Sequence, residues 1–279
     1  MQEEVFQNKK EFRLVGLSRS GNHGVINWII NQLEGRYCFL NCTEPKHNPF
    51  STVRPLNADG DVYRTNIRDF NLDQEKTGKF SSKDFLLYNH EDCFLGPLNG
   101  KFFQQKKTEW TGESKERKDI LLLRDPYNLF ASRLKSGLIR GHYTHHGSKP
   151  ISLLTLQRLY KQHAREFLGE KNYLKNKILI NFNLWARSRD YREKLAIELG
   201  IPFTDKGFKE VTEVAGGSSF DGTKFSGMAH KMDVNDRWKK YAADPEFQDL
   251  FDPEINELAT RIFGEIEPVK HFKNNLISV

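Results

Sequence analysis

The sequence predicts a three-layer α/β fold, with a central parallel sheet flanked by helices, in a single domain over residues 1–279. Short apolar runs alternate with amphipathic stretches, as they do where crossover helices join parallel strands. The run DILLL at 119–123 is continuously apolar, which is typical of a strand buried on both faces. Neither an internal repeat nor a low-complexity linker divides the chain.

Apolar spacing gives each element its place along the chain. The expected strands lie at residues 12–17, 36–41, 84–88, 119–123 and 177–184. The expected helices lie at residues 21–33, 126–136, 152–168, 187–199 and 253–263. Pro126 suits the first turn of its helix, and Gly200 suits the position just after the last turn of another.

Three polar stretches are expected to be irregular. Residues 43–80 are rich in Asn, Asp, Pro, Gly and Thr, and their periodicity is weak. Residues 101–118 are predicted to form an exposed loop, and residues 137–150 a loop rich in Gly and His. Long irregular segments in compact domains are often functional, so 43–80 and 137–150 are candidate pocket elements.

The formal net charge is +6, from 43 Lys and Arg against 37 Asp and Glu. This balance favours anionic partners, although a basic surface without a specific role explains it equally well. The basic residues are spread along the chain, so we expect no nucleic-acid partner. The start of the chain has no apolar signal core, and no apolar run approaches the roughly 18 residues that span a bilayer. We therefore expect a cytoplasmic protein without membrane insertion.

Cysteine and histidine spacing predicts no metal site. Cys38, Cys42 and Cys93 match neither a disulfide framework nor a zinc pattern, and the first two are expected to be small buried residues near a strand. The HYTHH run at 142–146 has a crude metal-ligand spacing, but no Cys or acidic residue lies near it in the sequence.

The stretch EFRLVGLSRSGNHGVINWII at 11–30 is the most informative one. It predicts a strand, a tight polar loop and a helix, so free backbone N–H groups and the positive end of the helix dipole meet at one point. Such a point binds phosphate-like anions, although an ordinary strand–helix turn is the alternative. A Walker A loop would continue with Lys and Ser or Thr, whereas Asn22 and His23 follow Gly21 here. The loop therefore fits an anion other than magnesium–ATP.

A second segment, LLLRDPYNLFASRLKSG at 121–137, has a basic residue at the end of the buried strand. Arg124 lies at the rim where α/β proteins bind ligands, and Ser132 follows about two helical turns later. Taken alone, this segment reads as a helix start with a surface pair of Arg124 and Asp125.

Together, the two segments resemble those of the sulfotransferases that use 3′-phosphoadenosine 5′-phosphosulfate (PAPS). SRSGNHG is similar to their 5′-phosphosulfate loop, P-[KR]-S-G-T-x-[WL], and R-D-P-x-x-x-x-x-S-R is similar to their 3′-phosphate motif. The resemblance implies a P-loop-NTPase-like sulfotransferase fold. It also implies metal-independent, in-line transfer of a sulfuryl group from PAPS to an acceptor hydroxyl or amine, which leaves 3′,5′-diphosphoadenosine (PAP).

The resemblance also implies roles for individual residues. Arg19 would contact the transferred sulfuryl group, and Arg124 and Ser132 would hold the 3′-phosphate. The loop residues around the 5′-phosphosulfate would be Ser18, Ser20, Gly21, Asn22 and His23. This loop departs from the family pattern, because Ser18 replaces the usual Pro, and Asn22 and His23 replace hydroxyl residues but can still donate hydrogen bonds.

A catalytic base is expected directly after the strand at 84–88, where the family places a His or Glu that takes the acceptor's proton. His90 has a suitable intrinsic pKa, and Glu91 can serve if it is desolvated. Residues 216–241 would close over the nucleotide, with Lys231 near the 3′-phosphate, or form a solvated basic loop. Phe182 and Trp185 could stack on adenine, but their place in a strand and its exit favours the core.

The acceptor is left open by the sequence. The loops at 43–80 and 137–150 would shape a pocket for a small-molecule or carbohydrate acceptor, and a phenol, a lipid head group or a peptide also fits. The alternative function is a P-loop nucleotide or small-molecule kinase with a degenerate Walker A loop. That alternative needs a magnesium ligand at position 22 or 23.

Overall fold

The computed structural model of the chain describes residues 6–57, 59–139, 151–213 and 217–266. Its strands are β1 (Asn8–Gly16), β2 (Tyr37–Leu40), β3 (Tyr63–Thr65), β4 (Lys83–Glu91), β5 (Ser114–Leu123) and β6 (Lys177–Asn181). Its α-helices are α1 (Asn22–Gln32), α2 (Leu72–Lys76), α3 (Lys101–Thr111), α4 (Pro126–Lys135), α5 (Leu153–Phe167), α6 (Phe182–Arg187), α7 (Arg189–Leu199), α8 (Pro245–Gln248) and α9 (Pro253–Phe263). Short 3₁₀ helices are η1 (Pro49–Ser51), η2 (Gly96–Asn99), η4 (Ala229–Lys231) and η5 (Arg237–Tyr241).

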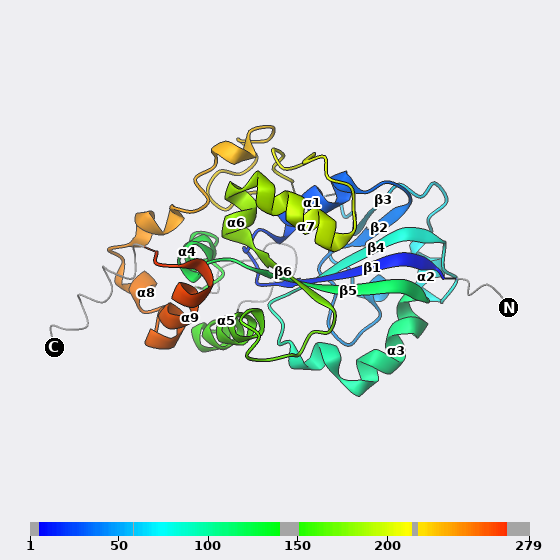
Figure 1. Ribbon diagram of the computed structural model, residues 1–279, viewed down its shortest axis with the longest axis horizontal. Coiled ribbons are helices and arrows are strands. Elements are labelled where there is room, and N and C mark those ends of the chain that lie inside the picture. Colours follow the sequence, from blue (N-terminus) through cyan, green and yellow to red (C-terminus); the bar gives the residue numbers. More distant parts are fainter. Residues whose placement is uncertain (1–5, 58, 140–150, 214–216, 267–279) are drawn as a thin grey trace.

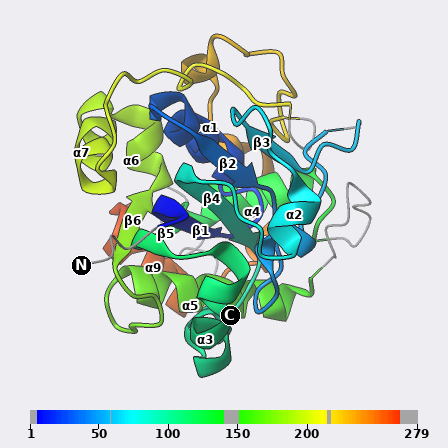
Figure 2. The same ribbon diagram turned by 90° about the vertical axis from the view of Figure 1, so that its right-hand side faces the viewer.

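The six strands form one sheet in the order β3-β2-β4-β1-β5-β6. Every neighbouring pair is parallel except β2 and β3, which are antiparallel at one edge. Helices α1, α6 and α7 lie on one face of the sheet and α3 and α5 on the other (Figures 1 and 2). The predicted α/β class with helices on both faces is therefore confirmed.

Strand β5 shows why its sequence is continuously apolar. Ile120 and Leu122 pack into the core cluster that contains Trp28 of α1, whereas Leu121 packs against Leu95 on the opposite face. Successive side chains of a strand point to opposite faces, so a strand covered on both sides needs apolar residues at every position.

The predicted loop at 101–118 is wrong, because these residues form α3 and the first half of β5. The buried stripe of α3 consists of Phe103, Lys107 and Thr111, at helical spacing. Lys107 reaches this position because its Nζ lies 3.7 Å from a carboxylate oxygen of Glu11. Only one of these three buried residues is apolar, so the sequence shows no helical periodicity of apolar residues here.

Two further boundaries differ from the prediction. The strand expected at 177–184 ends at Asn181, whose side chain accepts a hydrogen bond of 3.1 Å from the Leu184 N–H and begins α6. The segment 43–80, expected to be irregular, contains η1, β3 and α2. The ion pair between Glu75 and Lys83, 2.7 Å long and almost fully buried, ties this segment to β4.

The arrangement of parallel strands places the loops after β1, β2, β4 and β5 at one edge of the sheet, where α/β proteins bind ligands. Strand β4 runs to Glu91, so His90 and Glu91 are its last residues rather than residues that follow it. Within the described ranges, no helix is both long enough and apolar enough to cross a bilayer.

Candidate functional site

A cavity of about 470 Å³ opens at the carboxyl edge of the sheet. Among the residues predicted for the site, its lining includes Ser18, Arg19, Gly21, Asn22, His23, Glu91 and Arg124. Four predicted residues are outside the lining, namely Ser20, His90, Ser132 and Lys231. The cavity therefore brings together most of the loop after β1 with the ends of β4 and β5.

The loop after β1 forms an open helix N-terminus. Gly21 is the N-cap of α1 at φ 92°, and no side chain caps this helix. A Cβ atom at Gly21 would lie 2.1 Å from the ring of Phe182, so only glycine fits there. Since Gly21, Asn22, His23 and Gly24 all line the cavity, the positive end of α1 is available to an anion.

The ion pair between Arg133 and Asp92 holds this loop in place. The N–H of Ser18 donates to Asp92 at 2.9 Å, and Arg133 donates both to Asp92 at 2.8 Å and to the Ser18 carbonyl at 3.1 Å. The Ser20 N–H donates to the Leu17 carbonyl at 3.0 Å. These bonds hold the loop in place without using the N–H groups of the first turn of α1.

Two arginines converge on one serine hydroxyl beside this loop. Arg124 Nη1 donates to Ser132 Oγ at 3.3 Å and to the Arg19 carbonyl at 3.2 Å. Arg237 Nη1 reaches the same Ser132 Oγ at 3.4 Å. Ser132 is fully buried behind the two guanidinium groups, which explains why it is not part of the cavity lining.

The charge of this cluster is only partly compensated. Burial, together with the nearby charges of Arg237 and Arg19, lowers the pKa of Arg124 to about 9 against the opposing effect of Asp125. Burial also lowers the pKa of Arg237, although Asp221 lies 3.2 Å from its Nη2. Both Nε atoms are buried without a hydrogen-bond partner among the described residues. Such a cluster is stabilised by an added anion.

Aromatic rings form the wall next to the arginines. Phe182 and Trp185 stack with centroids 5.6 Å apart, and Phe208 meets Trp185 edge-on at 5.3 Å. The Arg124 guanidinium lies 5.0 Å from the centroid of Phe182. Phe182 and Trp185 belong to the core, as expected, and also line the cavity, where they offer ring surface to a flat ligand.

Glu91 lines the cavity at the end of β4, and its neighbours come from α1 and from the segment after β2. Asn22 Nδ2 donates to Glu91 Oε1 at 2.7 Å, and His23 Nε2 lies 2.9 Å from Asn41 Oδ1. Cys42 lies between them at φ 45°, and burial raises the pKa of its thiol well above the usual range. A carboxylate held in this way can accept a proton from a ligand in the cavity.

His90, the other predicted base, is not part of the cavity lining. It is fully buried, and its Nδ1 donates to the Thr43 carbonyl at 2.8 Å. Burial, together with the charge of Arg13, lowers its pKa from 6.5 to about 3. Neighbouring residues of a strand point to opposite faces, so only one of His90 and Glu91 can reach the cavity, and Glu91 does.

Lys231 lies in η4 with an exposed side chain, and the cavity lining includes its neighbours but not Lys231 itself. Arg237, Asn41, Arg54 and Phe208 also line the cavity, although none of them was predicted as a site residue. Arg237 lies in the segment 216–241 that was expected to close over the nucleotide. The sequence surroundings of these four residues carry no distinguishing signal, since several basic residues surround Arg237. Arg54 lies in the expected pocket segment 43–80, whereas the expected pocket loop 137–150 falls, from residue 140 on, outside the described residues.

Neither a protein-family model nor a curated protein matches the chain. Among solved structures, it is similar to a mouse sulfotransferase, SULT7A1, crystallised as a complex with PAP. The two are 17% identical, the match covers 97% of this chain and 90% of the other, and the TM-score is 0.41. The chemistry of the site follows from its own residues. An open helix N-terminus, a pair of buried arginines, aromatic rings and a carboxylate surround one cavity.

Proposed function

We propose that the chain is a sulfotransferase that moves a sulfuryl group from PAPS to a hydroxyl or amine of an acceptor. One observation carries the proposal: the open N-terminus of α1 and the pair of Arg124 and Arg237 line the same cavity, so it offers two groups of anion-binding donors. PAPS carries anionic groups at both its 5′ and 3′ ends. Magnesium–ATP carries its phosphates in one chain and has no 3′-phosphate.

At the first site, the backbone N–H groups of Asn22, His23 and Gly24 would hold the 5′-phosphosulfate. Arg19 would add positive charge there. Its Nε donates to Ser219 Oγ at 2.8 Å, and this bond links the loop after β1 to the segment that follows residue 216. Hydrogen-bond donors fixed before the reaction stabilise the charge that develops on the transferred group.

At the second site, Arg124, Arg237 and Ser132 would hold the 3′-phosphate. A phosphate beside the two guanidinium groups would accept charge-assisted hydrogen bonds and reduce the repulsion between them. Arg237 takes the place in this proposal that the sequence analysis assigned to Lys231, because Arg237 reaches Ser132. The rings of Phe182 and Trp185 would support the nucleoside between the two sites.

Glu91 would act as the base. The acceptor oxygen or nitrogen attacks sulfur, the bond from sulfur to the bridging phosphate oxygen breaks, and the acceptor's proton passes to the Glu91 carboxylate. PAP leaves with the electron pair of the broken bond. We favour Glu91 over His90 because Glu91 lines the cavity and His90 is enclosed by protein. Catalysis then comes mostly from positioning and electrostatics.

Ligand-dependent melting tests the proposal. PAP at about 100 times its Kd should stabilise the protein by about 2.7 kcal/mol, whereas magnesium–ATP should have little effect. Stabilisation by magnesium–ATP alone would refute the sulfotransferase and support the kinase alternative. Arg124→Ala should abolish the effect of PAP, whereas Arg36→Ala, a change of an exposed arginine at the entry to β2, should not.

Transfer of radiolabelled sulfate from PAPS to a panel of acceptors then tests the reaction itself. The panel should include sugars, phenols and amines. Hydrolysis of PAPS without an acceptor product would leave the binding assignment in place and refute the transfer.

A further inference from the structure

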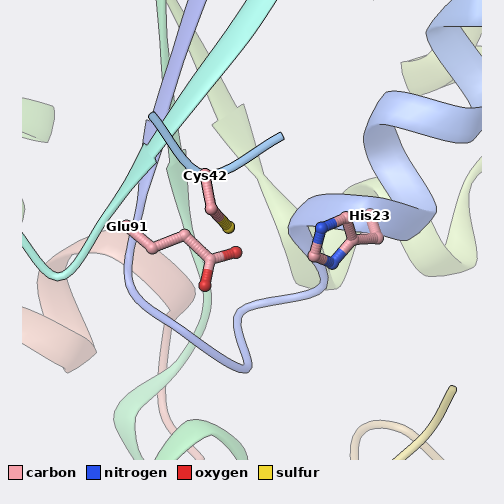
Figure 3. A group of neighbouring side chains, drawn as sticks. All are labelled: His23, Cys42 and Glu91. Carbon is pink, nitrogen blue, oxygen red and sulfur yellow. The ribbon is translucent and has the colours of Figure 1, made fainter. Parts of the chain in front are cut away.

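Three residues with metal-binding side chains, His23, Cys42 and Glu91, meet in the lining of the cavity. His23 comes from the first turn of α1, Cys42 from the segment after β2, and Glu91 from the end of β4. One ligand atom from each lies within 4.8 Å of the other two, and all three residues are half-buried. Figure 3 shows the thiol, the carboxylate and the imidazole ring around one common space. All three residues also line the cavity, so this space is open to a ligand.

The donor set fits one class of metal. A thiolate, an imidazole and a carboxylate together suit Zn²⁺, whereas Mg²⁺ and Ca²⁺ prefer oxygen ligands alone. Zinc bond lengths place neighbouring ligand atoms about 3.5 Å apart in a tetrahedral site. The three atoms therefore need to move closer to one another by about 1 Å to hold the ion. Three protein ligands leave a fourth position open to the cavity.

The hydrogen bonds around His23 leave one ring nitrogen available. Asn41 Nδ2 donates to the carbonyls of Arg54 at 3.2 Å and of Pro55 at 3.1 Å, so Asn41 Oδ1 is the acceptor that faces His23. His23 Nε2 therefore carries the proton in its 2.9 Å bond to Asn41. Its Nδ1 keeps a free lone pair. An outer hydrogen bond of this kind fixes the tautomer and orientation of metal-binding histidines.

The other two ligands are also held by asparagines. Asn22 Nδ2 donates to Oε1 of Glu91 at 2.7 Å, which leaves Oε2 without a bond to Asn22. Asn89 Nδ2 donates to the sulfur of Cys42 at 3.6 Å. Each of the three ligands thus has one neighbouring amide that orients it.

We propose that His23, Cys42 and Glu91 bind Zn²⁺ and that the bound ion inhibits the enzyme. Binding releases the thiol proton of Cys42 to solvent and forms bonds from zinc to sulfur, nitrogen and one carboxylate oxygen. A Glu91 carboxylate on zinc cannot also take the acceptor's proton, so zinc competes with the acceptor. The inhibitory part rests on the proposed function, whereas the binding part does not.

Cobalt spectroscopy tests the binding part without any activity assay. Co²⁺ added to the full chain should give a near-ultraviolet absorption from sulfur-to-cobalt charge transfer. Cys42→Ser should remove this band, and the matched variant Cys93→Ser should keep it. A triple change to Gln at positions 142, 145 and 146 should also keep it. A band that survives in Cys42→Ser, or is lost in Cys93→Ser, refutes the site, and so does the absence of any band.

Zinc competition against a chromophoric chelator measures affinity in the same proteins. Asn41→Ala should weaken zinc binding about 10- to 100-fold, because it removes the orienting bond to His23. It also removes the two bonds from the Asn41 amide to the carbonyls of Arg54 and Pro55, so its melting temperature is measured alongside. His23→Gln should weaken it more than Asn41→Ala does. Equal affinity in the wild type and His23→Gln would contradict the assignment.

Inhibition is measured against each protein's own zinc-free rate. Zinc should raise the apparent KM for the acceptor in the wild type and should have a much smaller effect in Cys42→Ser. Noncompetitive inhibition, or equal inhibition of both proteins, would refute the inhibitory role. A cobalt band without sulfuryl transfer would support the metal site and refute the proposed function. Sulfuryl transfer without a cobalt band would support the proposed function and refute the metal site.

Discussion

The side-chain amide of Asn22 donates a 2.7 Å hydrogen bond to the carboxylate of Glu91. This bond joins the first turn of α1, which would hold the transferred group, to the end of β4, which would supply the base. The same amide donates to the Leu17 carbonyl at 3.0 Å, so it is fixed on both sides. The position of the carboxylate is thus coupled to the conformation of the loop after β1.

Glu91→Gln should distinguish the role of Glu91 as a base from its role in holding the loop after β1. Glutamine keeps an oxygen for the bond from Asn22 but cannot take the acceptor's proton. We expect the transfer rate to fall about 10²- to 10⁴-fold, while stabilisation by PAP remains. The comparison is His90→Gln, whose rate per folded molecule should be retained. A normal rate for Glu91→Gln with a lost rate for His90→Gln would assign the base to His90.

His90 should make the protein less stable in acid. The unfolded chain binds a proton at His90 near pH 6.5, whereas burial keeps the folded form neutral down to about pH 3. Between these values the unfolded state binds more protons, so the free energy of unfolding decreases as the pH falls. From pH 7 to pH 5 this loss is on the order of 2 kcal/mol.

Chemical denaturation of His90→Gln at both pH values measures this contribution. The variant keeps a donor for the Thr43 carbonyl and should lose less stability than the wild type on acidification. His47→Gln is the control, since the His47 side chain is exposed. If all three proteins lose the same stability between the two pH values, His90 is not a buried neutral imidazole.

Arg237→Ala should weaken PAP binding by about 30-fold or more, because loss of a buried charged partner costs about 2 kcal/mol or more. The control is Lys239→Ala, two residues away, whose side chain is exposed and pairs with Asp236. It should change PAP affinity about 2-fold at most, as expected for a surface ion pair. Titration calorimetry with PAP measures both, and equal affinities for the two variants would exclude Arg237 from the 3′-phosphate site.

Gly21→Ala should disrupt the loop after β1. The left-handed backbone alone costs alanine about 1–2 kcal/mol, and the added Cβ would overlap the Phe182 ring. Gly24→Ala is a close control, because its Cβ would meet Trp185 at an ordinary 3.7 Å and alanine favours a helix. We expect a lower melting temperature and weak PAP binding for the first variant, and neither for the second. An unchanged Gly21→Ala protein would show that the loop tolerates another conformation.

The sequence predicted those parts of the protein whose signal is local. The apolar run of β5 and the strand–loop–helix pattern at 11–30 depend on neighbours along the chain, so both were readable. Helix α3 was missed because Lys107 becomes a buried residue only through Glu11, about a hundred positions away. A pairing between such distant residues leaves no periodic trace in the sequence.

The residues of the candidate site also fall into those that local sequence predicts and those that only the folded chain brings together. The sequence by itself determined the loop after β1 and the pair of Arg124 and Ser132, since each is set by spacing within one strand–helix unit. Only the tertiary structure shows that Glu91 lines the cavity and that His90 is enclosed by protein, because this depends on which face of β4 meets the cavity and which meets the core. Only the tertiary structure brought Arg237 to Ser132, because that contact joins residues 105 positions apart through folding alone.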